Sequence, residues 1–317
     1  MQKMTIALIF GGISSEREVS LNSGKQVYDA LDKNKYTILK YDPKTDIPRL
    51  VADAAKIDCA LIILHGPYGE DGTVQGLLDL LDIPYQGAGV LGSAVAMNKL
   101  LSKQLYENAG LVVPPYQLAR RDEAIDGDRI IGQLGLPVVV KPVETGSSVG
   151  MTIVRDGSRL PEAVGHALEF GETAMIEAFI RGTEITCGVL GNQHVEALPL
   201  IEIIPGEGYE FFDYEAKYQP GATEEICPAR IDAELTQAAQ SCAVAAHKAL
   251  YCRGYSRTDM ILKDGTFFVL ETNTIPGMTA TSLFPQSAKA AGLSFSQLLD
   301  RLIELGSESR RRQTTRG

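Results

Sequence analysis

The sequence has few of the residues that stabilise small secreted folds. It contains five cysteines in 317 residues, an odd number without a C-x-x-C pair, which argues against a disulfide framework. Several of them stand in apolar runs, so we expect small buried side chains in a reducing compartment. The five are Cys59, Cys187, Cys227, Cys242 and Cys252.

Long apolar runs and an excess of positive charge are also missing. No apolar stretch approaches the roughly 18 residues of a membrane span, and the N-terminus has no charged head followed by a long apolar run. Thirty basic against forty acidic residues give a net charge of −10, which disfavours nucleic acid and anionic membranes as partners. We therefore expect a cytoplasmic protein. The polar segment 307–317, with its basic cluster Arg310–Arg312, is predicted to be a disordered tail.

The length and the order of the apolar segments indicate an α/β protein of two or three domains. In the first hundred residues, apolar strands alternate with helices, which is typical of a parallel sheet covered on both faces. Ser15–Glu18 fits a capping box that would open a helix ending near Leu31. The predicted strands are Met4–Phe10, Tyr36–Tyr41, Cys59–Leu64 and Ile83–Tyr85, with a further helix at Val74–Leu81. Ligands bind beyond the carboxyl ends of such strands, where Gly11–Gly12 and His65–Gly66 lie.

The remaining sequence predicts two units of mixed strands and helices. A helix over Ser93–Asn108 leads to Val113–Pro115, the candidate linker. The next strands are predicted at 137–141, 151–154 and 174–179, with a helix near 161–170, and strands dominate again from Glu184 to Ile204. The polar segment 206–228 is too long for an ordinary turn, which indicates an active-site lid. A helix over Ala233–Leu250 precedes the last two strands.

Those last two strands form a predicted hairpin that carries three oxygen-bearing side chains. Residues two apart in a strand share a face, so Arg257 lines up with Asp259, and Glu271 with Asn273. A turn near Gly265 places Asp259 almost opposite Glu271. Facing carboxylates repel unless a cation lies between them, and oxygen ligands suit Mg²⁺ bound to nucleotide phosphates. The alternative is an exposed polar face, which the apolar remainder of both strands disfavours.

Two glycine-rich loops have both functional and structural interpretations. Gly146–Gly150 lies between predicted strands, so it is no Walker loop, yet its N–H groups and hydroxyls could fold over a triphosphate. Lys141 would then place a positive charge beside the phosphates. The alternative is an ordinary hairpin and a lysine with a buried stem. Gly87–Gly92 matches G-x-G-x-x-G, but the strand before it is short and contains proline, which favours a tight turn.

Two residues at strand ends of the N-terminal unit are candidates for substrate binding. His65 opens the loop His65–Gly72 and could donate a hydrogen bond to a carboxylate or phosphoryl group; it could equally be a structural histidine. Glu16 follows Gly11–Gly12 and suits a substrate ammonium. The alternative for Glu16 is a first-turn residue favoured by the helix dipole.

Five long motifs, in this order, resemble those of the D-alanine–D-alanine ligase family of the ATP-grasp superfamily, from about Met4 to Leu305. They are Gly11–Gly24, His65–Gly72, Val140–Gly150, Phe212–Tyr218 and Glu271–Leu283. The resemblance implies ATP-dependent ligation of two D-alanine molecules through a D-alanyl phosphate, for peptidoglycan precursors. It also implies a homodimer and two Mg²⁺ or Mn²⁺ ions.

The resemblance implies a three-domain ATP-grasp architecture. An N-terminal parallel-sheet domain would cover residues 1–99. Two α+β domains, at 100–183 and 184–306, would enclose the nucleotide. The lid at 206–228 would belong to the third domain.

The resemblance also assigns roles to individual residues. The expected metal ligands are Asp259, Glu271 and Asn273, and the expected nucleotide residues are Lys99, Lys141, Ser147, Ser148, Glu177, Phe179, Ile180, Glu184 and, on the lid, Lys217. The expected substrate residues are Glu16, His65, Ser282 and Leu283. Arg257 and the N–H of Gly277 would stabilise the oxyanion of a tetrahedral intermediate. Glu16, Ser147 and Tyr218 match the family's hydrogen-bonded triad, which ties the lid to the site.

The chain departs from the family pattern at two positions. Asn98 stands where the family usually has aspartate, and Phe179 where some members have tryptophan. In the related D-alanine–D-lactate ligases, the lid differs and a histidine occupies the region of the second substrate. The lid of this chain has Lys217-Tyr218 and no histidine, which by this resemblance favours an amine over a hydroxyl nucleophile. The alternatives are a ligase for another amino-acid or depsipeptide pair, such as D-alanine with D-serine or with D-lactate, and a catalytically silent nucleotide-binding protein. The hairpin residues disfavour the silent protein.

Overall fold

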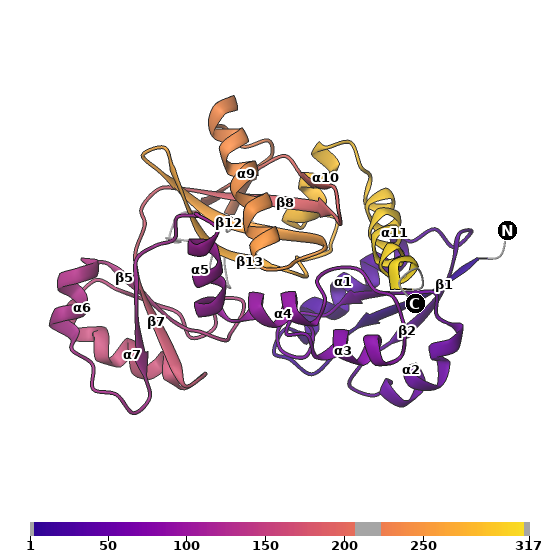
Figure 1. Ribbon diagram of the computed structural model, residues 1–317, viewed down its shortest axis with the longest axis horizontal. Helices are drawn as coiled ribbons and strands as arrows, with labels where there is room; N and C mark the ends of the chain where they lie inside the picture. Colours follow the sequence, from indigo (N-terminus) through magenta and orange to yellow (C-terminus); the bar gives the residue numbers. More distant parts are fainter. Residues whose placement is uncertain (1–2, 207–222, 314–317) are drawn as a thin grey trace.

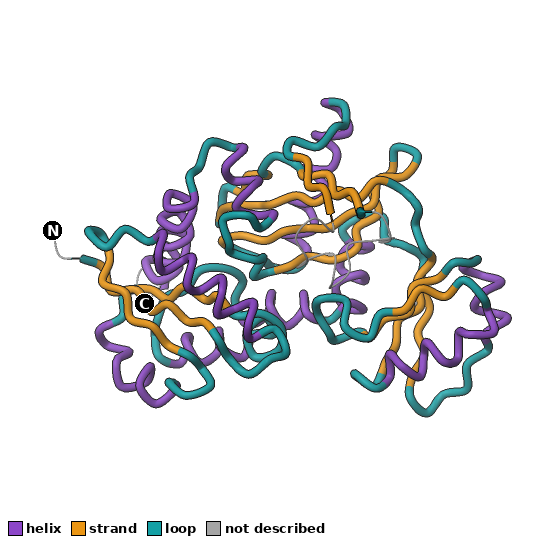
Figure 2. The backbone as a smooth tube through the Cα atoms, turned by 180° about the vertical axis from the view of Figure 1, so that it is seen from behind, coloured by secondary structure: helices purple, strands orange, loops and turns teal. Residues whose placement is uncertain are grey.

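The computed structural model describes residues 3–206 and 223–313, and within them the strands form three separate sheets. A three-stranded parallel sheet and a four-stranded antiparallel sheet lie at opposite ends of an elongated molecule (Figure 1). The six-stranded antiparallel sheet occupies the middle, as the view from behind shows (Figure 2). The predicted α/β class, with its parallel sheet at the N-terminus, is confirmed.

The N-terminal sheet has the strand order β2-β1-β3 and is parallel throughout. Its elements are β1 (Met4–Phe10), α1 (Arg17–Ala30), β2 (Tyr36–Tyr41), α2 (Ile47–Asp53), η1 (Ala54–Lys56), β3 (Cys59–Ile63) and α3 (Thr73–Leu80). The predicted capping box is wrong, because Glu16 is the N-cap of α1 and no side chain caps it. The predicted strand Ile83–Tyr85 is reduced to a single bridge between Tyr85 and Ala60.

The predicted helix over Ser93–Asn108 is two helices, α4 (Val90–Met97) and α5 (Lys99–Asn108). The break falls at Asn98, whose backbone is extended. Its Oδ1 accepts from the N–H of Leu101 and caps α5, while its Nδ2 donates to Glu144 at 3.0 Å. An aspartate at this position could cap the helix, but it could not donate to a second carboxylate.

The four-stranded sheet has the order β4-β7-β5-β6. Its elements are β4 (Tyr116–Arg120), α6 (Gly127–Leu134), β5 (Val138–Pro142), β6 (Thr152–Val154), η2 (Gly157–Arg159), α7 (Leu160–Leu168) and β7 (Thr173–Ala178). Val138, Val140 and Ile176 face the core beneath α7. Because side chains alternate along a strand, Lys141 and Glu177 lie on the opposite face, which lines the site described below.

The six-stranded sheet runs β11-β10-β8-β12-β13, with β9 paired to β8. Its elements are β8 (Thr183–Gly191), β9 (Val195–Ala197), β10 (Ile201–Pro205), β11 (Thr223–Ile226), α9 (Ala233–Ala249), β12 (Gly254–Lys263) and β13 (Thr266–Asn273). The alanine-rich helix α9 packs on one face of this sheet through Ala239 and Ala243. At the C-terminal end of the predicted lid, Thr223–Ile226 forms strand β11 and pairs with β10.

Packing does not follow the predicted boundaries along the chain. After α10 (Leu283–Ala290), the last helix α11 (Phe295–Gln313) returns to the N-terminal sheet (Figure 1). Leu298 and Leu302 share a core with Ile6 and Leu61. Residues assigned to the third domain therefore complete the core of the first. The prediction of a disordered tail is wrong for 307–313, which continue α11.

Helix α5, which begins at the predicted boundary between residues 1–99 and 100–183, also packs outside its predicted domain. Tyr106 is fully buried among residues of the six-stranded unit, including Val189 and Ala243. Its hydroxyl donates to Thr272 of β13 at 2.7 Å. A helix predicted to open the central domain therefore packs on the third sheet.

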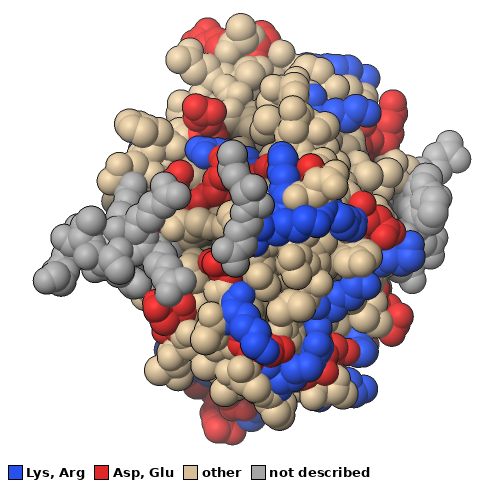
Figure 3. All heavy atoms as spheres, turned by 90° about the vertical axis from the view of Figure 1, so that its right-hand side faces the viewer, with Lys and Arg blue, Asp and Glu red and all other residues tan. Residues whose placement is uncertain are grey.

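The end of the molecule that carries the N-terminal sheet shows basic side chains interspersed with acidic ones (Figure 3). Three ion pairs in this part join Lys35 to Asp300, Arg49 to Asp46 and Lys56 to Asp53. Their lysine and arginine side chains are half exposed or more, so each pair contributes little to stability. No helix within residues 3–206 and 223–313 is long and apolar enough to cross a membrane.

Candidate active site

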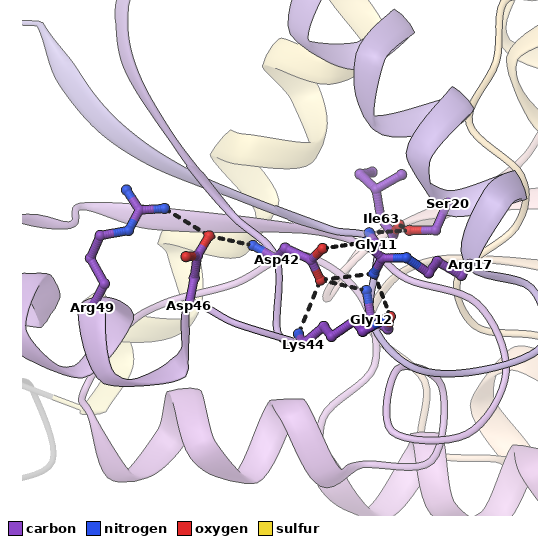
Figure 4. A network of polar contacts seen from close by, with 9 residues as sticks. All are labelled: Gly11, Gly12, Arg17, Ser20, Asp42, Lys44, Asp46, Arg49 and Ile63. Atoms are coloured by element: carbon purple, nitrogen blue, oxygen red, sulfur yellow. Dashed lines mark hydrogen bonds and ion pairs between the residues drawn. The ribbon is translucent and has the colours of Figure 1, made fainter.

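A polar network fixes the carboxyl ends of the parallel strands (Figure 4). Asp42, just past β2, accepts from the N–H of Gly12 at 2.9 Å and from Arg17 Nη2 at 2.6 Å. Ser20 of α1 accepts from the N–H of Gly11 and donates to the carbonyl of Ile63. Burial opposes ionisation of Asp42, but Arg17 and the backbone donors outweigh it and lower its pKa. Helix α1 is thereby locked to all three strands.

This lock places Glu16 at the edge of a cavity between the three sheets. Glu16 is only 5% exposed, and its Oε1 accepts from the hydroxyl of Ser147 in the glycine- and serine-rich loop. A Cβ on Gly66, whose φ is +71°, would lie 2.8 Å from Glu16 Oε2, so only glycine leaves room for the carboxylate. The structure thus brings the predicted pair Glu16 and Ser147 together, although 131 residues separate them.

The cavity has a volume of about 530 Å³ and is lined by all three parts of the chain. It collects most of the residues predicted to bind substrate or to stabilise charge: Glu16, His65, Lys99, Ser147, Arg257, Glu271, Asn273, Gly277, Ser282 and Leu283. We call it the polar chamber.

The hairpin β12–β13 forms one wall of the polar chamber. Asp259 lies directly opposite Glu271, as predicted to within one residue, and a register shift between Asp259 and Met260 also places Arg257 opposite Asn273. Arg257 holds Asp259 through two contacts, Nε to Oδ1 at 2.8 Å and Nη2 to Oδ2 at 2.7 Å. Thr186 donates to the same carboxylate at 2.6 Å. The two residues to which the resemblance gave separate roles are therefore bound to each other.

The donor set fits a hard cation. Asp259 and Glu271 offer carboxylate oxygens, which can each accept more than one contact, and Asn273 offers an amide oxygen nearby. Within the described ranges 3–206 and 223–313, no group of three or more His, Cys, Asp or Glu residues could hold a metal by itself. A cation here would need further oxygens from a ligand, which is how Mg²⁺ binds beside phosphates.

The N-terminus of α10 forms another wall. Ser282 is the N-cap of this helix, and its hydroxyl pairs with Thr279 Oγ1 at 2.7 Å. Gly277 lies close by, since a Cβ on it would be 3.1 Å from Ser282 Oγ. The backbone N–H groups at the start of a helix favour an anion such as a carboxylate.

A second, narrower cavity opens between the four-stranded and six-stranded sheets. It has a volume of about 130 Å³, and we call it the slot. Its apolar walls are formed by Val139, Met151, Ile153, Phe179, Ile180, Ile261 and Leu270, and its polar lining includes Lys99, Lys141, Ser148, Glu177, Glu184, Asp259 and Glu271. Every predicted nucleotide residue within the described part of the chain lies here, except Ser147, which lines the polar chamber.

Two lysines flank one buried carboxylate at the slot. Lys141 Nζ lies 2.6 Å from Glu177 Oε2, and Lys103 Nζ lies 2.7 Å from Glu177 Oε1. Burial alone would raise the pKa of Glu177, but the two lysines lower it to about 2. Sequence reasoning missed Lys103, which gives no signal of its own in a helix sequence.

The loop His65–Gly72 contributes two side chains, His65 and Glu70, whose pKa values are shifted from their usual ranges. Burial lowers the pKa of His65 to about 4, so the ring is neutral near pH 7. Glu70 accepts from the N–H of Gly66 at 2.6 Å, and burial together with nearby Glu16 raises its pKa to about 8. Glu70 lies in the predicted loop motif His65–Gly72, but sequence reasoning assigned it no separate role. Its raised pKa depends on burial and on Glu16, which are not evident from the loop sequence.

The polar chamber and the slot meet at Lys99, Thr145 and Glu271, which line both. Lys99 donates to the carbonyl of Thr145 at the start of the glycine- and serine-rich loop. Ser147 and Ser148 of this loop have φ values of +49° and +59°, which non-glycine residues rarely adopt and which often mark functional loops. Predicted residues Lys217 and Tyr218 lie outside the described residues.

Two family models match most of the chain. A family model described as the D-ala D-ala ligase C-terminus matches residues 105–304. The model described as the D-ala D-ala ligase N-terminus matches residues 5–48 and 44–88. The D-alanine–D-alanine ligase of Syntrophobacter fumaroxidans is 63% identical over 307 residues, which cover 97% of this chain and 99% of that protein.

Solved structures share the fold over nearly the full length. The D-alanine–D-alanine ligase of Bacillus anthracis in complex with ATP superposes with a TM-score of 0.86 at 39% identity, covering 98% of this chain and 99% of that one. The VanG D-Ala:D-Ser ligase of Enterococcus faecalis gives a TM-score of 0.81 at 35% identity, covering 96% of this chain and 100% of that one.

Proposed function

Because this chain belongs to the D-alanine–D-alanine ligase family, we propose that the slot and the polar chamber form one active site with the residue roles given below. The reaction is the ATP-dependent, ADP-forming ligation of two D-alanine molecules. One observation carries the assignment of the two cavities: an apolar slot meets a polar chamber at Lys99, Thr145 and Glu271. A nucleotide in the slot would have its phosphates at this boundary, next to amino acids in the chamber.

The slot would bind the adenosine of ATP. Phe179 and Ile180 offer apolar surface to the purine, and Glu177 offers an acceptor to its amino group. Lys99 and Lys141 supply positive charge toward the phosphates. Ser147 and Ser148 contribute hydroxyls from the strained loop. Glu184 would accept from the ribose.

The hairpin would hold Mg²⁺, and we expect two ions. Asp259, Glu271 and Asn273 would be the protein ligands, and the phosphates of ATP would supply further oxygens. A bound Mg²⁺ supplies charge that offsets the triphosphate during phosphoryl transfer. The two contacts of Arg257 with Asp259 hold this carboxylate in place before the nucleotide arrives.

The polar chamber would hold both amino acids. Glu16 binds the ammonium of the first D-alanine, and neutral His65 lies beside it as a hydrogen-bonding group. The carboxylate of this first D-alanine then attacks the γ-phosphorus of ATP, giving D-alanyl phosphate and ADP. The N-terminus of α10, with Ser282 and Leu283, binds the carboxylate of the second D-alanine.

The second step joins the two amino acids. The amine of the second D-alanine attacks the acyl phosphate, and phosphate leaves from a tetrahedral intermediate. Arg257 and the N–H of Gly277 would stabilise the oxyanion of this intermediate. A lid carrying Lys217 and Tyr218 would close over the site, with Tyr218 joining Glu16 and Ser147, and would exclude water that otherwise hydrolyses the acyl phosphate.

The wider setting follows from the same family. We propose that the enzyme is a homodimer of three-domain subunits in the cytoplasm and that its product enters peptidoglycan precursors. Five cysteines without a disulfide support a reducing compartment.

The test is phosphate release from ATP and Mg²⁺, with products identified by mass. D-alanine is compared with L-alanine and with D-alanine plus D-serine or D-lactate. We expect phosphate release matched by D-alanyl-D-alanine, and none with L-alanine. Phosphate release without dipeptide would overturn the assignment of the second subsite, and no release would overturn the substrate pair.

A further inference from the structure

Lys103 is the most completely buried charged side chain that the proposed reaction leaves without a role. It is 0% exposed, and its Nζ lies 2.7 Å from Glu177 Oε1. Lys103 lines neither the slot nor the polar chamber. A buried ammonium is costly unless it is paired, so a pair at this depth needs an explanation.

The pair joins two different structural units. Lys103 stands on α5, whose neighbour Tyr106 packs into the core of the six-stranded unit. Glu177 stands on β7, in the middle of the four-stranded sheet between Tyr116 and Val139. The slot lies between these two sheets, so the ion pair links its walls at the position of the carboxylate.

Glu177 Oε1 still has the capacity to accept a hydrogen bond. The contact with Lys103 is close, but its direction does not meet hydrogen-bond geometry, and among residues 3–206 and 223–313 this buried oxygen has no hydrogen-bond partner. Lys141 holds the other oxygen from the same sheet at 2.6 Å. A carboxylate fixed by one cation on each oxygen and exposed to an apolar slot is a rigid, permanently ionised acceptor.

We propose that Lys103 is a specificity-determining positioning residue, which holds Glu177 so that the slot accepts a 6-amino purine and rejects a 6-keto purine. The inference rests on the proposed binding of ATP in the slot. Adenine presents an amino donor to Glu177. Hypoxanthine and guanine present a carbonyl oxygen at the same ring position, which a fixed carboxylate repels. Without Lys103, the carboxylate can turn toward Lys141 and the walls of the slot can shift.

The experiment compares ATP with inosine triphosphate as phosphoryl donors for the intact enzyme and for Lys103→Met. We expect the ratio of kcat/KM for ATP to that for inosine triphosphate to fall roughly tenfold or more in the variant. The loss arises from a higher KM for ATP, while the KM for D-alanine is unchanged. Lys248→Met, which removes an exposed lysine from α9, is the matched control and keeps the wild-type ratio.

A double-mutant cycle separates this role from a purely structural one. If Lys103 acts through Glu177, adding Lys103→Met to Glu177→Gln changes the ratio no further. An unchanged ratio in Lys103→Met, or an equal loss in both backgrounds, would overturn the inference. Should Lys103→Met fail to fold, Lys103→Gln replaces it with the same expected direction.

Failure of the proposed function has a different outcome. A wild-type enzyme that forms no dipeptide from ATP and D-alanine overturns the active site itself. A wild-type enzyme that does so, with a Lys103→Met ratio unchanged, overturns only the role of Lys103.

Discussion

The slot and the polar chamber share a boundary but are built differently. The slot lies between two sheets, and strand alternation places its residues, as with Lys141 and Glu177 facing away from the core of their sheet. The polar chamber is assembled mostly from loop and helix ends, such as Glu16 at the start of α1 and Ser282 at the start of α10. Regular strands therefore line the cavity that we propose for a planar, apolar ligand, whereas loop and helix ends supply directional polar groups for the proposed small charged substrates.

The two regions also treat charge differently. In the slot, Glu177 is held between two lysines and its pKa is lowered to about 2. In the chamber, the pKa of Glu70 is raised to about 8 by burial and by nearby Glu16. The buried carboxylate Glu177 of the slot is thus balanced by protein cations, whereas the chamber has an excess of acidic groups that a substrate ammonium would relieve.

The first prediction tests the boundary between the regions and has the largest expected effect. Glu271→Ala should lower kcat by on the order of 10³-fold, since it removes a proposed metal ligand that lines both cavities. Circular dichroism and thermal unfolding should show a retained fold. Glu196→Ala, on exposed β9, is the control. Near-normal turnover in Glu271→Ala would mean that the metal site lies elsewhere.

Arg257→Lys should give the next largest effect, about 10²-fold in kcat with a smaller change in KM. Lysine cannot reproduce the two contacts of the guanidinium with Asp259 or reach the oxyanion in the same geometry. Arg230→Lys is a matched control, because Arg230, whose side chain is largely exposed, makes the same two-pronged contact with Glu202. Equal activity of the two variants in steady-state assays would contradict the role of Arg257.

Glu16→Gln separates the chamber from the slot. The KM for D-alanine should rise by roughly 10- to 100-fold, since a charge-assisted contact with the ammonium becomes neutral. The KM for ATP should change little, because Glu16 does not line the slot. Glu162→Gln on α7 should match the wild type. A parallel rise in both KM values would show that the two cavities do not bind independently.

The smallest expected effect is on the pH dependence of the free energy of unfolding. His65 of the chamber and His247, which lies under β12 within 2.7 Å of Ser256, both have a pKa lowered to about 4 by burial. The unfolded chain, in which histidine has a pKa of about 6.5, takes up protons at a higher pH than the native protein does. The stabilisation from these two neutral histidines is therefore fully present above about pH 6.5 and is lost as the pH falls toward 4. The loss per histidine should approach about 1.4 kcal/mol per pH unit.

Denaturant titrations between pH 7 and 5 test this prediction. His247→Gln should reduce the slope of the free energy of unfolding against pH by the contribution of one histidine, which approaches about 1.4 kcal/mol per pH unit. His194→Gln, at an exposed position, should leave the slope unchanged. Identical slopes in all three proteins would show that His247 has the same pKa in the native and unfolded states.

Much of the local structure follows from the order of residues alone. The strands β1 and β2 have the predicted bounds. The hairpin turn alone would place Asp259 opposite Leu270, within one residue of Glu271 as predicted, and a register shift between Asp259 and Met260 then pairs Asp259 with Glu271. Strand periodicity is a short-range property, so it can be extracted from a sequence. The resemblance added the identities of residues that lie in the two cavities, and the comparisons confirmed the family.

Only the tertiary structure decided how these parts combine. Nothing in the sequence of α11 predicts that Leu298 and Leu302 complete the core of the first sheet, or that Lys103 of α5 reaches Glu177 across the slot. The break at Asn98 also depends on a partner, Glu144, that lies 46 residues away. Propensity and periodicity act over a few residues, whereas buried contacts between distant segments are selected by the packing and electrostatics of the whole chain.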